Sequence, residues 1–229
     1  MTMSFGPVMR IHVGDLYIEL APLTKESMGD FIDPIKSEHG INRHSVSQYV
    51  RYTLSRTSEQ EEAYYEKISN DPTCVKWGIW VLNGSERELI GLSDLNSIEG
   101  TLVRQATSGS LIFRKEYWGK GIASAAHKAR TWYAFTQLGL HRIMSAVIQG
   151  NEGSLKALTR SGYNLVYVER NTHFVNGRQH HQDNLECLNP LEPFWSTWWG
   201  TDKPSQRALK ARPLVETALA WAEENVELL

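Results

Sequence analysis

The stretch Tyr117-Trp118-Gly119-Lys120-Gly121-Ile122-Ala123-Ser124 decides how this chain is interpreted. It follows an apolar run over residues 110–113 and precedes a helical pattern over 125–138. A strand, a glycine-rich turn and a helix in this order form an anion site, because glycines let the backbone approach a ligand and a helix N-terminus offers unpaired N–H groups. The spacing matches neither the dinucleotide fingerprint nor the P-loop, and no Ser or Thr follows a Gly-Lys pair to hold magnesium. Hydrolysis of a nucleoside triphosphate is therefore not expected.

A second motif lies further along the chain. Asn151-Glu152-Gly153-Ser154 begins a helical run that ends at Ser161-Gly162-Tyr163. Together the two motifs resemble the GCN5-related N-acetyltransferase (GNAT) family, with its Q/R-x-x-G-x-G/A acyl-CoA loop and its Asn-x-x-Ser helix start. The aromatic-Trp-Gly-Lys-Gly loop is most similar to the RimJ/RimL-like branch, which acetylates ribosomal-protein N-termini. Trp118 stands where the wider family has Arg or Gln, and the resemblance covers roughly 17–188.

The order of predicted elements agrees with this resemblance. Strands are expected over 16–23, 74–82, 89–95, 105–113, 141–147, 164–175 and 182–188, and helices over 25–35, 58–68, 125–138, 211–229 and after Asn151. Hairpin turns are expected at Asn83-Gly84 and Asn176-Gly177, and Thr57 or Ser58 is expected to cap the helix over 58–68. The resemblance implies a GNAT fold of the α/β (α+β) class. Its mixed, mostly antiparallel central sheet would have about seven strands, helices on both faces, and a V-shaped splay between the fourth and fifth strands that holds acyl-CoA. This domain would span 1–189, and the aromatic segment and helix of 190–229 would pack on it.

The resemblance assigns residues to the binding of acetyl-CoA as a co-substrate. The backbone of Leu111 and Phe113 would bind the pantetheine arm, and Asn151 would contact it too. The pyrophosphate would meet the loop and the first turn of the next helix, at Gly119, Lys120, Gly121, Ile122, Ala123 and Ser124. Trp118 would either pack under the loop or cover the CoA.

The resemblance also implies a proton donor, Ser154, for the leaving CoA thiolate; an ordinary cap or first-turn serine is the alternative. The strand before the loop carries no acid at 106–110. His173, near the position where relatives carry an acid, is therefore the proposed base, because imidazole titrates near neutrality. His180, His181 and Asp94 are further candidates, and water is another.

Composition narrows the partners and the setting. The 229 residues have a net charge of −2 and a hydrophobic content of 41%, so no strong attraction to nucleic acid or anionic membranes is expected. No apolar run reaches the length of a membrane span. Cys74 and Cys187 are expected to be buried free thiols in a cytoplasmic protein. The spacing of His180, His181 and Asp183, with His39 and His44 as distant candidates, matches no common zinc pattern, so no metal is expected.

These observations predict an acetyl-CoA-dependent N-acetyltransferase that moves an acetyl group to a primary amine by direct attack in a ternary complex. A protein N-terminal α-amine is favoured as acceptor. The alternatives are a small amine, such as an antibiotic, a polyamine or an amino-sugar, and a non-catalytic CoA-binding regulatory module. Residues 37–56 would line the acceptor side, and Glu38 is their only carboxylate, which disfavours a polycation. The aromatic tail could also serve a homodimer.

Overall fold

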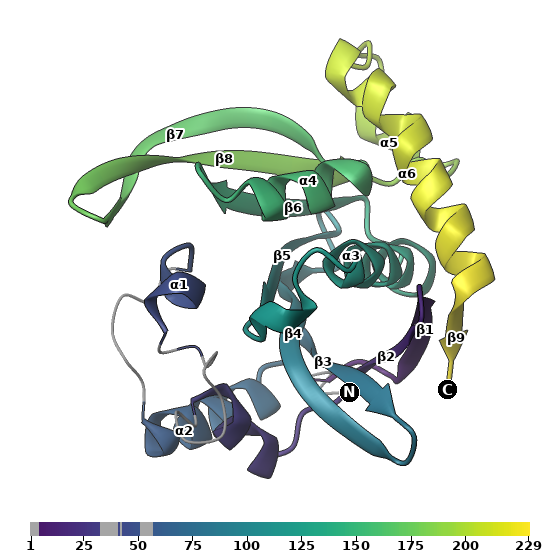
Figure 1. Cartoon of the computed structure of the whole chain (residues 1–229). Helices are drawn as coiled ribbons and strands as arrows, with labels where there is room; N and C mark the ends of the chain where they lie inside the picture. Colours follow the sequence, from purple (N-terminus) through teal and green to yellow (C-terminus); the bar gives the residue numbers. More distant parts are fainter. Residues whose placement is uncertain (1–4, 33–40, 42, 51–56) are drawn as a thin grey trace. The chain divides into compact units, whose positions relative to one another are not determined.

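The computed structural model describes residues 5–32, 41, 43–50 and 57–229. Its described strands number nine, rather than about seven, and belong to one sheet in the order β7-β8-β6-β5-β4-β3-β2-β1-β9 (Figure 1). The expectation of a mixed, mostly antiparallel sheet is confirmed, since β5 pairs with β6 in parallel and the other recorded pairs are antiparallel. The chain divides into two compact units, and each is described by itself.

The first unit comprises Met1–Asn96, Gly109–Ile122 and Glu227–Leu229. Its first four strands are antiparallel neighbours: β1 (Met9–Val13), β2 (Leu16–Ala21), β3 (Val75–Asn83) and β4 (Glu86–Glu99). The pairs β1–β2 and β3–β4 are hairpins, whereas helices lie between β2 and β3 in the chain. The turn predicted at Asn83-Gly84 lies one residue later, at Gly84-Ser85, because Asn83 still pairs with Glu86. Gly84 is in the left-handed region at φ +63°. Sequence analysis missed β1, and it missed β9 (Val226–Leu228), beyond which the Leu229 N–H donates to the Val8 carbonyl at 2.9 Å.

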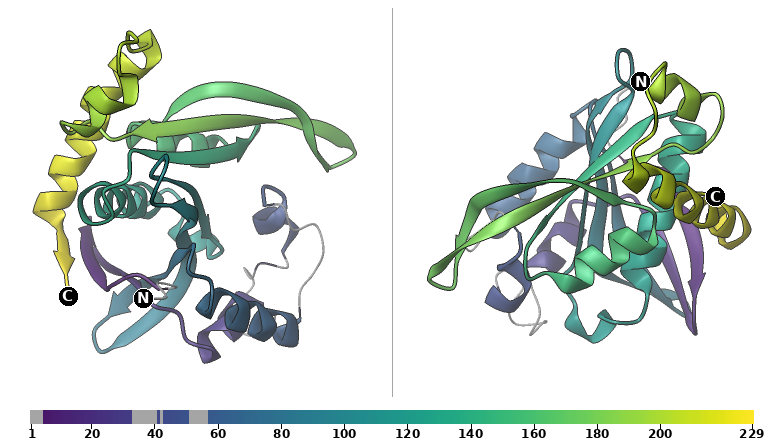
Figure 2. Two further views of the ribbon diagram at one scale, coloured as in Figure 1. Left: turned by 180° about the vertical axis from the view of Figure 1, so that it is seen from behind. Right: turned by 90° about the horizontal axis from the view of Figure 1, so that it is seen from above.

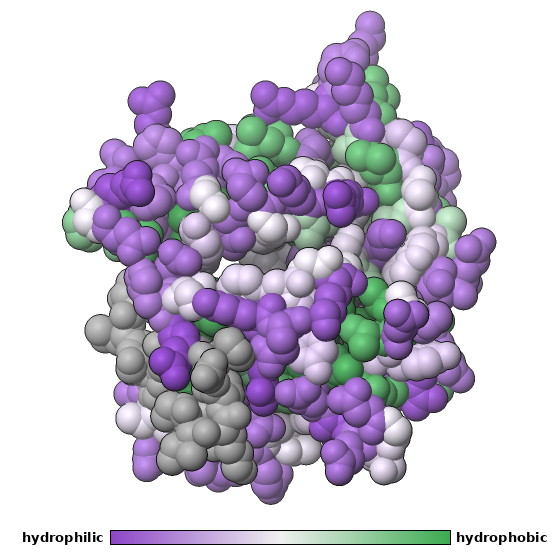
Figure 3. All heavy atoms as spheres, in the orientation of Figure 1, coloured by the Kyte–Doolittle hydropathy of each residue, from purple (hydrophilic) through white to green (hydrophobic). Residues whose placement is uncertain are grey.

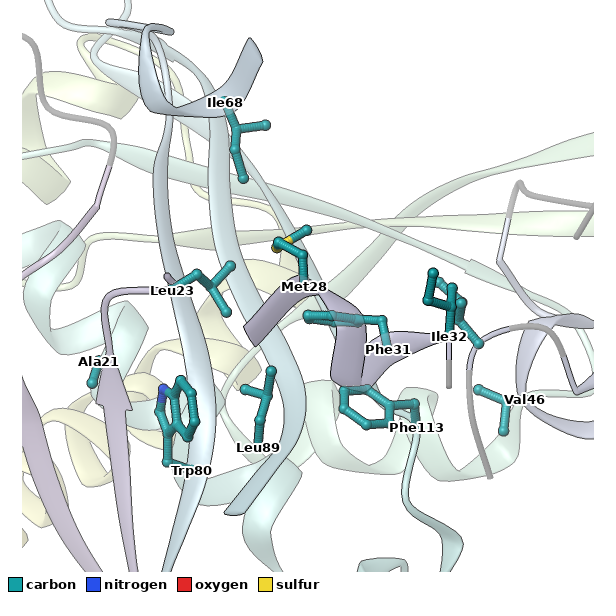
Figure 4. Close-up of a cluster of buried hydrophobic side chains, with 11 residues drawn as sticks. Ala21, Leu23, Met28, Phe31, Ile32, Val46, Ile68, Trp80, Leu89 and Phe113 are labelled. Atoms are coloured by element: carbon teal, nitrogen blue, oxygen red, sulfur yellow. The ribbon is translucent and has the colours of Figure 1, made fainter. Parts of the chain in front are cut away.

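The helices of the first unit are short apart from α2 (Ser58–Ser69). Thr57 and Gln60 form a capping box at its start, as the sequence predicts for this region. The helix expected over 25–35 is a 3-10 helix, η1 (Glu26–Phe31), and α1 (His44–Ser47) and η2 (Lys115–Tyr117) are single turns. Phe31 of η1 packs in a buried hydrophobic cluster (Figure 4), where the centre of its ring lies 4.9 Å from the centre of the Phe113 ring.

The second unit comprises Ser97–Ser108 and Ala123–Val226. The start of β5 (Gln105–Ile112) pairs in parallel with β6 (Arg142–Ile148), and β6 pairs with β8 (Arg178–Leu188). The parallel ladder joins Gln105, Ala106 and Thr107 to Arg142, Ile143 and Met144 and ends there, although both strands continue. These are the fourth and fifth strands counted from the sequence, between which the splay is expected.

Strands β7 (Asn164–Val175) and β8 form a long twisted ribbon (Figures 1 and 2). Asn176 and Gly177 make its turn, with φ of +54° and +75°, the left-handed pair typical of a two-residue hairpin. Between the pairs Glu169–Gln182 and His173–His180, β7 carries two more residues than β8 and bulges. Figure 3 shows apolar patches on this mostly hydrophilic surface, and Val166, Val168 and Phe174 are among the exposed residues.

The helices of the second unit include the C-terminal tail. They are α3 (Ile122–Trp132) with its π-helical continuation (Tyr133–Gln137), α4 (Glu152–Arg160), α5 (Phe194–Trp199) and α6 (Gln206–Asn225). The helix expected over 211–229 therefore begins earlier and ends at Asn225. Glu223 of α6 accepts a 2.6 Å hydrogen bond from the Trp132 indole, and Trp195 of α5 is buried. The tail thus packs on the unit that contains α3.

Two polar side chains of α3 are buried and contact each other. The Arg130 side chain is fully buried and donates to Nδ1 of His127 at 2.9 Å. Burial, together with the Arg130 charge, lowers the pKa of His127 well below its ordinary value. Cys74 and Cys187 are buried free thiols, as expected. No helix among the described residues is long and apolar enough to cross a membrane.

Candidate active site

The glycine turn has the backbone that the sequence predicts. Gly119 and Gly121 have φ of +77° and +84°, values that residues with a side chain rarely adopt. A Cβ at Gly119 would meet nothing within 4 Å, so backbone conformation rather than packing requires a glycine there. The residues from Trp118 to Gly121 are exposed, and α3 begins at Ile122 directly after them. An exposed turn that leads into a helix is suited to bind an anion.

Two aromatic residues fix the start of this turn within the first unit. The Trp118 indole N–H donates to the Ile112 carbonyl at 2.9 Å, and the side chain stays 47% exposed. The Tyr117 hydroxyl donates to Glu88 at 2.7 Å, and burial together with this carboxylate raises the Tyr117 pKa to about 12. Trp118 thus anchors the turn to the end of β5 while one of its surfaces remains open to a ligand.

The turn is also rich in positive charge. Lys120 is exposed, and its Nζ lies 5.0 Å from the centre of the Tyr117 ring. Lys115 lies in the same way 5.7 Å from the Trp118 ring. Neither amine has a carboxylate within salt-bridge distance among the described residues, so both could turn toward a phosphate. The residues present therefore fit the pyrophosphate of acetyl-CoA.

The two pantetheine residues predicted on the preceding strand differ in their surroundings. The Phe113 side chain is fully buried, and its backbone N–H donates to the Ile90 carbonyl at 3.0 Å. That N–H is therefore already used within the first unit. Leu111 is partly buried and packs against the same hydrophobic cluster as Phe113. Both side chains serve the core, which leaves backbone groups as their means of binding a ligand.

The start of α4 lies in the second unit, as do Ala123 and Ser124 in the first turn of α3. Asn151 is the N-cap, and its Oδ1 accepts a hydrogen bond from the backbone N–H of Ser154 at 3.3 Å. The cap role therefore belongs to Asn151, and the Ser154 hydroxyl has no hydrogen-bond partner in the described part of the chain. It is half-buried at a helix start, where it could donate a proton.

The candidate histidines lie on the β7–β8 ribbon of the same unit. His173 and His180 are directly paired across the strands, and Nδ1 of His173 lies 2.9 Å from the Thr172 hydroxyl. His180 contacts the Gln149 carbonyl with Nδ1 at 3.3 Å, two residues before the Asn151 cap. His181 accepts a hydrogen bond from the Asn171 backbone N–H at 3.1 Å. The structure thus brings His180 to the segment that begins α4.

Asp94, the remaining candidate base, belongs to a polar cluster in the first unit. Its carboxylate accepts from Asn96 at 2.6 Å and forms an ion pair with Lys76 at 3.5 Å. A Cβ at Gly109 would come within 2.5 Å of this carboxylate. Both oxygens are therefore engaged, which makes Asp94 a structural partner of Lys76 rather than a free base.

Two polar residues near the histidines were not identified from the sequence. Gln149 orients His180, and Glu169 accepts a hydrogen bond from the buried Gln182 at 3.4 Å. No motif marks either residue, because their positions depend on the register of β6, β7 and β8. Of the segment expected on the acceptor side, 37–40, 42 and 51–56 lie outside the described residues, and His39 is among them. Among the described residues, no group of three or more His, Cys, Asp or Glu could hold a metal ion.

Comparison with known proteins agrees with this geometry. A family model described as an acetyltransferase (GNAT) domain matches residues 18–164, more than half of the chain. The chain is 35% identical over 163 residues to the Bacillus subtilis protein "Putative ribosomal N-acetyltransferase YdaF", a match covering 59% of this chain and 88% of that protein.

Two solved structures share the fold. Mycobacterium smegmatis RimJ in complex with CoA-disulfide has a TM-score of 0.68 at 16% identity over 100% of both chains. A spermidine N-acetyltransferase from Vibrio cholerae, in complex with CoA and spermine, has a TM-score of 0.63 at 23% identity, covering 75% of this chain and 95% of that chain. The chain therefore belongs to the GNAT family and is an acetyl-CoA-dependent N-acetyltransferase.

Proposed function

We propose that this enzyme acetylates the α-amine of a protein N-terminus. One observation supports acetyl-CoA as the acyl donor: the exposed turn directly before α3 has Gly119 and Gly121 in left-handed conformations. The acceptor half is supported by the similarity to YdaF, a relative named for ribosomal acetylation, and by the Tyr-Trp-Gly-Lys-Gly form of the loop.

The bases available favour an α-amine on chemical grounds. An N-terminal α-amine has a pKa of about 7.7–8.0, whereas a lysine-like amine has one of about 10.4. His180 contacts the Gln149 carbonyl just before the start of α4, and His173 is the partner of His180 on the neighbouring strand β7. Imidazole titrates near neutrality and is matched to a weakly basic amine. An alkylamine would spend nearly all its time protonated at neutral pH and would need a stronger base.

The charge of the acceptor-side segment also favours a protein N-terminus over a polyamine. The family resemblance assigns residues 37–56 to that side, and they contain Glu38 as their single carboxylate against Arg43, Arg51 and Arg56. A site for a polyamine would need negative charge to attract several ammonium groups. We therefore place polyamines and other small amines second, as the close alternative.

The residues have the following roles in this proposal. The backbone and Lys120 of the turn, with the first turn of α3, bind the pyrophosphate, while Leu111, Phe113 and Asn151 position the pantetheine arm. The amine nitrogen attacks the thioester carbon, so that a C–N bond forms and the C–S bond breaks. A histidine of the ribbon, for which the sequence proposes His173, receives the amine proton. The free hydroxyl of Ser154 gives a proton to the departing thiolate.

The test is release of CoA thiol from acetyl-CoA with matched acceptors. One peptide would have a free N-terminus and no lysine, and its control would be the same peptide with a blocked N-terminus and one internal lysine. Spermidine and an amino-sugar complete the panel. Turnover with the free N-terminus and silence with the blocked peptide supports the proposal. Turnover confined to spermidine or the amino-sugar overturns it and assigns the enzyme to small amines.

A further inference from the structure

His180 is held by a rigid part of the second unit. Its Nδ1 lies 3.3 Å from the carbonyl oxygen of Gln149, in the short turn between β6 and α4. The Gln149 backbone N–H donates to the His181 carbonyl at 2.9 Å, and the Gln149 side chain donates to Asp183 at 2.7 Å. Because Gln149 is fixed to β8 by both of these bonds, the carbonyl that faces His180 cannot turn away.

This contact determines where the imidazole carries its proton. A carbonyl oxygen can only accept a hydrogen bond, so Nδ1 of His180 must be the donor. In the neutral ring Nε2 is then the unprotonated nitrogen, with a lone pair available. Nε2 is shielded from solvent and has no hydrogen-bond partner among the described residues. A buried acceptor without a partner costs about 1–3 kcal/mol, so its retention calls for an explanation such as a catalytic role.

The face of the ribbon that carries His180 has charged groups of both signs. His173 is its cross-strand partner, and Glu169 is paired with Gln182, two residues further along β8. Residues two apart on a strand share a face, so Glu169, His173 and Gln182 lie on the same side of the ribbon as His180. Glu169 is exposed and ionisable there, while Asp183 lies on the other side with its carboxylate on Gln149. By the same spacing Arg178 of β8, two residues before His180, also lies on this face. Glu169 can attract an ammonium group there, while Arg178 opposes it.

We propose that Nε2 of His180, rather than His173, accepts the proton of the acceptor amine. This assignment rests on the proposed function. As the amine nitrogen bonds to the acyl carbon and the C–S bond breaks, its N–H proton passes to Nε2. The resulting imidazolium keeps its Nδ1–H donated to Gln149, and Nε2 gives up the proton to water that enters the site after the products leave. In His173 the Nδ1 atom lies 2.9 Å from the Thr172 hydroxyl, a group that can donate or accept, so this contact does not determine the tautomer of His173.

The matched test compares neighbouring histidines. In His180→Asn the side-chain amide can still donate to Gln149, so the folding contact is kept while Nε2 is removed. In the control His181→Asn the amide oxygen can still accept from Asn171. We expect kcat to fall about 10²-fold or more in His180→Asn and to change less than about threefold in His181→Asn. Acetyl-CoA affinity, measured by calorimetry, should stay within about twofold of the wild type in both variants.

The pH profile adds a readout that a purely structural role would not change. The acidic limb of kcat/KM should disappear in His180→Asn and persist in His181→Asn and His173→Asn, although His173 and Glu169 face the same site. A His180→Asn enzyme that keeps more than a third of the wild-type rate across the profile would overturn the assignment. Loss of the limb in His173→Asn instead would transfer the role to His173.

One measurement does not depend on the variant folding or on turnover. Nitrogen NMR of the wild-type enzyme reports the tautomer of each histidine, and His180 is expected to be protonated on Nδ1 alone. A proton on Nε2 of the neutral ring would exclude it as the base. If the wild type acetylates no peptide but does acetylate a small amine, the proposed function fails. The His180 comparison is then made with that amine and decides independently.

Discussion

Replacing Gly162 by alanine should destabilise the protein more than a glycine substitution in an ordinary turn. Gly162 follows α4 with φ +87° and completes a Schellman motif, in which its N–H donates to the Thr159 carbonyl and that of Tyr163 donates to the Leu158 carbonyl. A Cβ at Gly162 would lie 2.3 Å from Cγ2 of Val215 on α6, and 2.7 Å and 2.9 Å from its backbone N and Cα. The glycine therefore serves both the turn and the packing of the C-terminal helix.

The size of the effect follows from these two demands. A left-handed conformation costs a residue with a side chain about 1–2 kcal/mol. Overpacking in a core costs about 1–3 kcal/mol more, and here the obstacle includes helix backbone, which cannot change rotamer. The free energy of unfolding should fall by about 2–5 kcal/mol in Gly162→Ala. Gly177→Ala is the control, because Gly177 has φ +75° but nothing within 4 Å of its Cβ position; it should lose only about 1–2 kcal/mol.

Urea unfolding monitored by far-UV circular dichroism measures the difference. Both variants should show midpoints below that of the wild type, with Gly162→Ala clearly the lower at an unchanged m-value. Val215→Ala in the Gly162→Ala background should restore little, since the contacts with the Val215 backbone remain. If Gly162→Ala and Gly177→Ala unfold within about 0.5 kcal/mol of each other, the argument from close packing of α6 is refuted.

Three further predictions concern charge, catalysis and pH. Lys120→Ala should weaken acetyl-CoA binding about fivefold, equivalent to about 1 kcal/mol, and the effect should be smaller in high salt. The control is Lys210→Ala, on an exposed part of α6. If both variants weaken binding equally, Lys120 makes no specific contact with the phosphates. Ser154→Ala keeps the backbone N–H that donates to Asn151, so it should fold normally and bind acetyl-CoA, yet lose about 10²-fold in kcat; an unchanged kcat would show that solvent protonates the thiolate. His127 is buried with a pKa well below its ordinary value of about 6.5, so below that pH the unfolded chain binds a proton that the folded chain does not. Stability should therefore fall as the pH drops below about 6.5, by up to about 1.4 kcal/mol per pH unit for this group. Urea midpoints at pH 7.5 and 5.5 should separate less in His127→Gln, and equal separation in both proteins would exclude His127 as the source.

Local patterns in the sequence were sufficient for most of the architecture. Alternating apolar residues located β3, and Thr57 located the start of α2. Asn-Gly pairs located the turn at 176–177, and they located the turn at 84–85 to within one residue. Each of these depends on interactions within a few residues. The short β1 and β9 were missed because their stability comes from pairing with distant strands. The tail helix was extended to Leu229 for the same reason, since nothing local indicates that residues 226–228 are a strand.

The same division applies to the site. The sequence by itself determined the family, the glycine turn with its left-handed residues, and the helix start at Asn151, because each is a contiguous motif whose backbone conformation is set locally. Only the tertiary structure decided which histidine has a free nitrogen. That depends on the register of β8 against β6 and β7, which places the Gln149 carbonyl on Nδ1 of His180 and the Asn171 N–H on His181. The contact between Gln149 and His180 joins residues 31 positions apart, and a single sequence carries no local signal for the register that brings them together.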